Sequence, residues 1–204
     1  MPILELLILP FKQDEATREA YIKTFWPTLA ALLSGKKGMK MRTSRMMLSS
    51  NNSDVSSIFQ PVMVVGWNAV SDFQTFVTGD ELGALRNSFI SLVTAATSPQ
   101  LYDTDVEPRS VFGCALTEVF KVKIGDHKEN KEKVKGAWGN FVKGVGEVKS
   151  LSGVSVNLNE RTFVGAIGWE SESGRDRVLK RSEVEELYGR LGDLESFVVK
   201  LDRL

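Results

Sequence analysis

The sequence predicts an α+β protein in which one βαββαβ unit occurs twice. Three observations support this prediction: a strand-like run with a central glutamate opens each half, the four tryptophans form two matched pairs, and strand and helix patterns follow in the same order. The matched residues are Glu5 and Glu118 (113 positions apart), Trp26 and Trp138 (112 apart), and Trp67 and Trp169 (102 apart). The 204 residues are therefore two copies of about 100 residues each.

The boundary between the copies is expected in the charged, proline-containing segment Asp105–Ser110. Repeat one then spans residues 1–108, and repeat two spans residues 109–204. The fall in offset from 112 to 102 requires about ten extra residues in repeat one, and the polar run Ser49–Ser57 is the natural place for them. We expect a long loop there that could act as a lid.

Each repeat opens with a strand and a long amphipathic helix. The strands are expected at about residues 3–9 and 112–123. In the helices that follow, apolar residues keep the i, i+3, i+4, i+7 spacing of a helix with one buried face. Asp14 is expected to cap the first helix, and Pro27 to kink or restart it. Three glycines between residues 136 and 144 weaken the second helix, which must therefore depend on packing.

Two strands, a second helical region and a closing strand complete each repeat. These strands are expected at about 38–48, 59–67 and 100–106 in repeat one, and at about 150–158, 161–169 and 195–201 in repeat two. Asn159 and Glu160 suit a tight hairpin turn, and Ser182 with Glu185 has the spacing of a capping box at the start of a helix.

The order βαββαβ is ferredoxin-like, and it gives a four-stranded antiparallel sheet with helices on one face. The other face of each sheet would be bare and apolar. Two such faces in one chain cover each other most economically. The sequence therefore predicts two ferredoxin-like repeats packed sheet to sheet as a closed, barrel-like unit.

The composition excludes several classes of function. Lys plus Arg is 26 and Asp plus Glu is 26, so the net charge is zero, which argues against broad electrostatic binding to nucleic acid or to an anionic membrane. The single histidine, His127, cannot build a multi-histidine metal site, and the single cysteine, Cys114, cannot form an internal disulfide. No apolar run reaches the length of a transmembrane helix. We therefore expect a cytoplasmic protein that binds no metal, nucleic acid or membrane.

Two segments resemble the strand-to-helix signature of the dimeric α+β barrel superfamily. They are Gly66-Trp67-Asn68-Ala69-Val70-Ser71-Asp72-Phe73 and Gly168-Trp169-Glu170-Ser171-Glu172-Ser173. The resemblance is greatest to fungal proteins related to antibiotic biosynthesis monooxygenases and stress-responsive barrels, and as a fold it covers nearly the whole chain, as an intrachain pseudo-dimer. In that pattern a histidine often lies six positions after the tryptophan. Here those positions hold Phe73 and Arg175.

The resemblance implies a small-molecule pocket between sheet and helices. Relatives include cofactor-free oxygenases of aromatic polyketides, polyketide cyclases, dehydratases, haem-degrading enzymes and proteins with no known activity. The missing histidines argue against the histidine-dependent members, and above all against haem ligation, since only His127 remains. We expect no cofactor.

Glu5 and Glu118 are the candidate catalytic residues. A carboxylate in the middle of an apolar strand should be paired, hydrogen-bonded or have a raised pKa. If it faces a cavity, it can act as a general base toward an acidic C–H or phenol of a substrate. Otherwise a salt bridge accounts for it, and the basic residues considered for that bridge are Lys40, Arg42 and Arg161. Glu118 has the better functional case on sequence, because it shares a strand face with Cys114 and Phe120.

Five aromatic residues are candidate walls for a substrate. They are Trp26, Trp67, Trp138, Trp169 and Phe120. Trp67 and Trp169 end the third strand of their repeats, where they either seal the corner between strand and helix or stack on a planar ligand. Trp26 and Trp138 lie on the apolar stripes of the long helices, where core packing is the more common role.

Three functions fit these residues. The first is a cofactor-independent enzyme of secondary metabolism that cyclises, dehydrates or otherwise rearranges an apolar, polyketide-like substrate. The second is a cofactor-free monooxygenase, and the third is a non-catalytic ligand-binding or stress-response barrel. In each case the partner is an apolar small molecule, and the protein is a monomeric pseudo-dimer or a homodimer.

Overall fold

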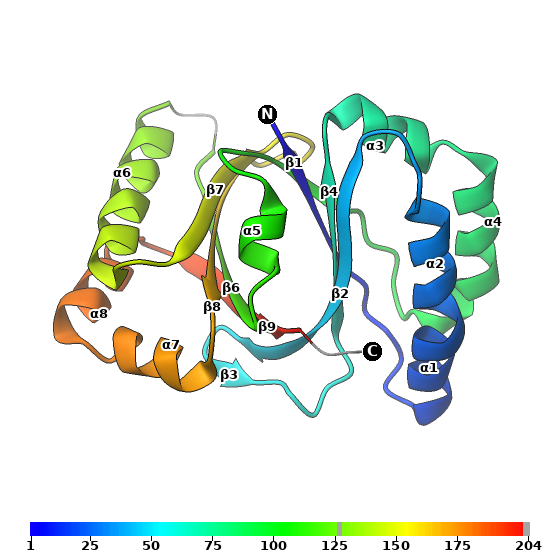
Figure 1. Cartoon of the computed structure of the whole chain (residues 1–204), viewed down its shortest axis with the longest axis horizontal. Coiled ribbons are helices and arrows are strands. Elements are labelled where there is room, and N and C mark those ends of the chain that lie inside the picture. Colours follow the sequence, from blue (N-terminus) through cyan, green and yellow to red (C-terminus); the bar gives the residue numbers. More distant parts are fainter. Residues whose placement is uncertain (126–127, 202–204) are drawn as a thin grey trace.

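Eight antiparallel strands form a closed barrel in the computed structural model, which describes residues 1–125 and 128–201. The strand order is β2-β4-β1-β5-β7-β8-β6-β9, and a further pairing of β2 with β9 closes the ring (Figure 1). The strands are β1 (Ile3–Ile8), β2 (Met39–Ser50), β4 (Pro61–Trp67), β5 (Gln100–Thr104), β6 (Leu116–Lys123), β7 (Lys149–Ser155), β8 (Thr162–Trp169) and β9 (Leu194–Lys200), with the short β3 (Ser53–Asp54) beside β2.

The helices cover the outside of the barrel in two groups. Repeat one contributes α1 (Glu15–Ala20), the π-helical turn η1 (Tyr21–Phe25), α2 (Trp26–Leu33), α3 (Val70–Val77), α4 (Asp80–Phe89) and the 3-10 turn η2 (Ile90–Leu92). Repeat two contributes α6 (Lys128–Val145), α7 (Glu172–Leu179) and α8 (Ser182–Gly189). Figure 1 shows these groups on opposite sides of the strands, with α5 (Pro108–Phe112) between them.

The two repeats have the same strand order. It is β2-β4-β1-β5 in repeat one and β7-β8-β6-β9 in repeat two, and the seams β5–β7 and β2–β9 join them. The register matches as well, because Glu5 lies opposite Val65 and Glu118 lies opposite Ile167. The prediction of two ferredoxin-like repeats packed sheet to sheet as a pseudo-dimeric barrel is confirmed.

Alternation along the strands divides the apolar residues into three clusters. Alternate residues such as Leu4 and Leu6 of β1 point into the barrel and join a central cluster from both repeats. The residues between them point to the helices, where each repeat has its own cluster. Glu5 is one of the strand residues that point away from the barrel interior, so the backbone directs its side chain toward the helices of repeat one.

The long helices of the two repeats differ by one residue, and the π turn accommodates it. Glu5 and Trp26 are 21 positions apart, whereas Glu118 and Trp138 are 20 apart, so repeat one has one more residue between its first strand and the helical tryptophan. A π turn holds more residues than an α turn. α2 begins at Trp26 with Pro27 in its first turn, as predicted. Asp14 accepts a hydrogen bond from the Thr17 backbone N–H at 2.7 Å, which confirms the predicted cap.

The extra residues of repeat one lengthen β2 and help to close the barrel. The chain turns at Asn51 and Asn52, whose φ angles of 47° and 63° are left-handed values that asparagine tolerates. Asn51 Oδ1 accepts a hydrogen bond from the Ser196 backbone N–H at 2.9 Å, and its own N–H donates to the Ser196 carbonyl at 2.7 Å. The expected lid is therefore wrong: this segment lies on β9 of repeat two.

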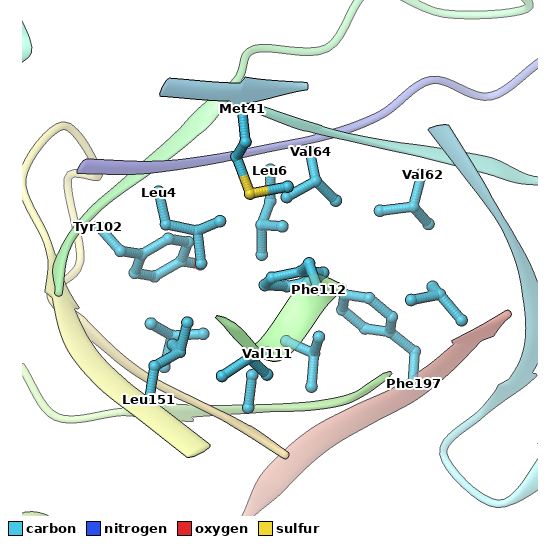
Figure 2. Close-up of a cluster of buried hydrophobic side chains, with 14 of the residues drawn as sticks. Leu4, Leu6, Met41, Val62, Val64, Tyr102, Val111, Phe112, Leu151 and Phe197 are labelled. Carbon is cyan, nitrogen blue, oxygen red and sulfur yellow. The ribbon is translucent and has the colours of Figure 1, made fainter. Parts of the chain in front are cut away.

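A short helix fills the centre of the barrel. α5 begins with Pro108 in its first turn, and Figure 2 shows its Val111 and Phe112 among the inward-facing side chains of both repeats. The sequence predicts a strand from residue 112 and a linker before it, and this is wrong, since β6 begins only at Leu116. Two further local predictions also fail. Six residues, 156–161, connect β7 to β8, and the side chain of Ser182 does not cap α8.

Arg45 holds the end of α5 from inside the barrel. It lies on β2 with no exposed surface, and its guanidinium donates hydrogen bonds to the carbonyl oxygens of Phe112 and Cys114, the latter at 3.1 Å. Carbonyls at a helix C-terminus lack partners within the helix, so the guanidinium satisfies groups that would otherwise be buried and unpaired. Burial lowers the pKa of Arg45 to about 10, which leaves it charged at neutral pH.

Candidate functional site

A cavity of about 340 Å³ lies between the sheet of repeat one and its helices. Its floor is formed by β1 and β4, its walls by η1, α2, α3 and α4, and its rim by residues 90–99. The uncharged lining residues are Leu7, Leu9, Phe11, Phe25, Leu29, Leu33, Met63, Val65, Phe76, Val77, Leu82, Leu85, Phe89, Ile90, Val93 and residues 95–99. The charged lining residues are Glu5 and Arg86.

Glu5 is the buried titratable group of this cavity. Its residue is 7% exposed, and its Oε2 accepts a hydrogen bond from Trp67 Nε1 at 2.7 Å. Its Oε1 accepts no hydrogen bond from the described residues. Burial raises the pKa of Glu5 from its ordinary 4.5 to about 7, against the smaller lowering effects of the Trp67 hydrogen bond and the charge of Arg86. The carboxyl can therefore take up or release a proton near neutral pH.

Arg86 is the second charged group of the cavity, and it lies at the exposed end. It projects from α4, and its side chain is exposed. No carboxylate of the described part of the chain lies within ion-pair distance of its guanidinium. The apolar cavity thus has a carboxyl inside and an unpaired cation at its mouth.

Glu118 has a different environment in repeat two. Its residue is 1% exposed, and Arg175 donates to both carboxylate oxygens, from Nε at 2.9 Å and from Nη2 at 2.7 Å. The salt bridge considered from the sequence is present, with Arg175 as its partner. Arg175 lies six residues after Trp169, the position that Phe73 occupies after Trp67. Among described residues, the buried Nε1 of Trp169 has no hydrogen-bond partner.

Aromatic side chains fill the space over the sheet in repeat two. The Trp138 ring lies against Gly165, where an added Cβ would come within 2.6 Å of ring atoms. Phe120 packs against Trp138 with ring centroids 5.4 Å apart. In repeat one the position opposite Leu7 on β4 is Met63, whereas the position opposite Phe120 on β8 is Gly165. Larger side chains thus occupy, in repeat two, the region that forms the cavity of repeat one.

The structure brings some of the predicted site residues together and separates others. Glu5 and Trp67 are in contact in repeat one, whereas Trp26, at the start of α2, is partly buried against the helix-side cluster of that repeat and does not line the cavity. Glu118, Trp138, Trp169 and Phe120 belong to the packed helix side of repeat two.

Sequence reasoning missed two residues that line the cavity. Phe25 is buried and faces the cavity because it lies in the π turn. A π turn leaves no periodic pattern of apolar residues from which it could be predicted. A comparison of the two repeats could have found Arg86. The matching position 102 residues later holds the uncharged Tyr188, so the charge at Arg86 is a difference between the repeats.

The remaining candidates supply no ligand set. His127 lies outside the described residues. Cys114 is a buried free thiol whose pKa is raised by burial. In the described part of the chain, no group of three or more His, Cys, Asp and Glu could hold a metal ion, and no helix is long and apolar enough to cross a membrane. Among the described residues, the side chains that line the cavity include no imidazole and no thiol.

No protein-family model matches the sequence, and no curated protein matches it. Among solved structures, an anthrone oxidase-like protein aligns with a TM-score of 0.62 at 14% identity, covering 99% of this chain and 92% of that chain. A Lactobacillus acidophilus NCFM protein, provisionally assigned as a monooxygenase, aligns at 0.59 and 10% identity, covering 97% and 92%. A mutant chlorite dismutase from Candidatus Nitrospira defluvii aligns at 0.58 and 11% identity, covering 98% and 91%.

These alignments show a shared fold. The structural neighbours are ferredoxin-fold barrels of the antibiotic biosynthesis monooxygenase type, so the resemblance in the sequence is confirmed at the level of fold. At such low identities the likeness does not carry an activity from one protein to another.

Proposed function

We propose that the chain is a cofactor-independent enzyme that removes a proton from an apolar, flat substrate bound in the cavity of repeat one, with Glu5 as the general base. The observation that supports this most is a buried carboxyl whose pKa is raised to about 7 and which faces an apolar cavity. Sequence reasoning favoured Glu118, but its two hydrogen bonds from Arg175 hold it as a paired carboxylate. The assignment therefore moves to Glu5.

The proposed step is a proton transfer. A C–H or O–H bond of the substrate breaks, its electron pair stays on the substrate as an enolate or phenolate, and the proton moves to the Glu5 carboxylate. Trp67 Nε1 holds Oε2 and so orients the carboxyl, which leaves Oε1 for the substrate. Glu5 then returns the proton to another carbon, as in a rearrangement or cyclisation, or to a leaving hydroxyl group, which departs as water.

Cofactor-free oxygenation is the second candidate, because the aligned structures include an anthrone oxidase-like protein. It begins with the same proton transfer, after which the substrate carbanion reduces dioxygen. A non-catalytic carrier is the third candidate, favoured by the many apolar residues of the lining. The two enzyme candidates share one first step, and the carrier lacks it.

The experiment uses anthrone, a tricyclic ketone with an acidic methylene group, as the probe. Without dioxygen and in D₂O, the wild type should exchange the methylene hydrogen for deuterium, measured by NMR. Glu5→Gln should slow this exchange at least about 100-fold, since it removes the base. Glu118→Gln is the matched control and should retain exchange in the folded fraction. Equal exchange in Glu5→Gln and wild type would contradict the proposal.

Oxygen consumption separates the candidates. Under air, an oxygenase consumes dioxygen with anthrone at a rate that depends on Glu5, whereas a cyclase or dehydratase exchanges deuterium without consuming it. A carrier binds anthrone and does neither. The exchange rate should also rise with pH through about 7, because the base acts in its ionised form.

A further inference from the structure

Arg86 is an arginine that lines the cavity of repeat one and has no ion-pair partner among the described residues. Arg175 pairs with Glu118, and Arg190 pairs with Glu186 on the surface of repeat two. Arg86 makes no ion pair or hydrogen bond with the described residues, yet its side chain lines the cavity. A cation that borders an apolar cavity and stays unpaired is available to an anion from outside the chain.

The same position in repeat two lacks the charge. Tyr188 stands there, and its ring packs against Phe120 and Phe141 with centroids 5.8 Å from each. The arginine thus occurs in the repeat that has the cavity, and an aromatic side chain occurs in the repeat whose space is filled.

The surroundings of Arg86 suit a ligand with an apolar body. Ile90 follows one helical turn after Arg86, lines the same cavity and is 69% exposed. Beyond it the lining is aliphatic and aromatic as far as Glu5. A volume of about 340 Å³ lies at the small end of the ~300–1,000 Å³ range of ligand pockets.

We propose that this cavity takes a flat, apolar molecule of roughly two or three fused rings that carries one oxyanion, which Arg86 binds at the mouth while the rings lie between sheet and helices. This rests on the proposed function, because it names the substrate class of the same cavity. Arg86 sets the orientation: the anionic end stays at the mouth, and the opposite end lies toward Glu5. A guanidinium suits this role because its planar N–H groups match the geometry of a carboxylate.

Calorimetric titration with two probes of equal shape tests this proposal. 2-Naphthoate carries the anion, and 2-naphthamide is its neutral counterpart. At about pH 6, where Glu5 is mostly protonated, Arg86→Gln should weaken naphthoate binding about tenfold and leave naphthamide binding within about twofold. Arg86→Lys should recover only part of the loss, because lysine restores the charge but not the planar pair of N–H donors. Raising NaCl from about 0.02 M to about 0.5 M should weaken naphthoate binding to the wild type and leave naphthoate binding to Arg86→Gln unchanged.

The matched control is Arg177→Gln, an exposed arginine on α7 outside the cavity, which should bind both probes as the wild type does. The proposal is overturned if Arg86→Gln binds naphthoate as tightly as wild type, if it weakens both probes equally, or if the wild type binds neither. A failure of this binding proposal can be distinguished from a failure of the proposed proton transfer. Glu5→Gln should slow anthrone exchange at least about 100-fold without weakening naphthoate binding, so each residue is tested by its own readout.

Discussion

In each repeat, the residue six positions after the tryptophan of the third strand determines which groups donate hydrogen bonds to the buried glutamate. Phe73 packs the edge of its ring against Trp67 and leaves Glu5 with a single indole donor. Arg175, at the matching position, reaches Glu118 with two N–H groups. A guanidinium favours the ionised carboxyl, whereas burial favours the neutral one. Equivalent glutamates in the two repeats therefore have different hydrogen-bond partners.

Phe73→Arg should lower the pKa of Glu5 from about 7 to below about 5, because the guanidinium would reach it as Arg175 reaches Glu118. NMR titration of ¹³C-labelled glutamate carboxyls measures this pKa. Phe73→Leu changes the packing without adding charge and should keep the pKa within about one unit. An unchanged titration in Phe73→Arg contradicts the role given to this position.

The raised pKa of Glu5 also makes stability depend on pH. A carboxyl whose folded pKa exceeds its unfolded value binds its proton more tightly in the folded state. Its contribution is full below about pH 4.5 and is lost as pH rises through about 7. Glu5→Gln should remove this slope and raise the free energy of unfolding at about pH 8.5 by up to roughly 3 kcal/mol relative to wild type.

Urea denaturation at about pH 5 and about pH 8.5 measures this difference. Glu118→Gln is the comparison, and it should destabilise the protein at both pH values, because Arg175, whose side chain is only 17% exposed, loses its carboxylate partner on β6 and keeps only Asp176. A wild type and a Glu5→Gln variant with equal pH slopes would show that Glu5 does not titrate in this range.

At the residue scale, the sequence predicted part of the site. Glu5 and Glu118 stand out because each interrupts an apolar strand, and both are buried. Their partners did not follow from the sequence, since Arg175 lies 57 residues after Glu118 and reaches it only through the register of β6, β8 and α7. A pairing of that kind depends on tertiary geometry and leaves no local pattern.

At the scale of elements, the long helices account for the presence of a cavity in one repeat. Trp138 on α6 lies flat against Gly165 of β8 and covers the sheet. In repeat one the π turn precedes Trp26, which is only partly buried, and the smaller ring of Phe25 faces the sheet instead. One additional helical residue thus changes which side chain lies over the strands.

Replacing these tryptophans should have unequal costs. Trp138→Ala should lower the free energy of unfolding by about 3–5 kcal/mol, because it removes a buried ring and leaves a void. Trp26→Ala should lower it by less than about 2 kcal/mol, since Trp26 is partly exposed. Guanidinium denaturation followed by circular dichroism measures both. Equal losses in the two variants would contradict the packing described here.

The elements that the sequence predicted well are those long enough to show a period. The two long helices and the eight barrel strands are near their expected positions because apolar residues repeat at helical or strand spacing in them. α5 has only five residues, which is too short for a helical period to appear. Its last residue, Phe112, was therefore predicted as the start of the next strand.

At the scale of the whole molecule, the two halves share one interior. The central cluster draws residues from strands of both repeats, with Phe112 of α5 in the middle of the view in Figure 2. Arg45 of repeat one ties the end of α5 to the barrel wall. Repeats joined in this way are expected to unfold as one unit.

Arg45→Met should lower the free energy of unfolding by about 2–3 kcal/mol in a single transition, because the carbonyls of Phe112 and Cys114 lose their charged donor. Urea denaturation followed by tryptophan fluorescence and by circular dichroism measures both the loss and the number of transitions. Arg42→Met, on the same strand and without such bonds, is the control. Two separate transitions, or equal losses in both variants, would contradict this role.

The pairing of β2 with β9 has a consequence for how the chain is made. Asn51 and its partner Ser196 are 145 residues apart, so this seam cannot form until β9 has been synthesised. At ~5–20 residues per second, a ribosome needs roughly 7–30 s to cover that distance. Throughout that interval the inner sheet face of repeat one, with Leu4, Leu6 and Val64, lacks the complete second sheet that covers it in the folded protein. Until β9 emerges, the nascent chain therefore exposes apolar sheet surface of the kind that favours aggregation.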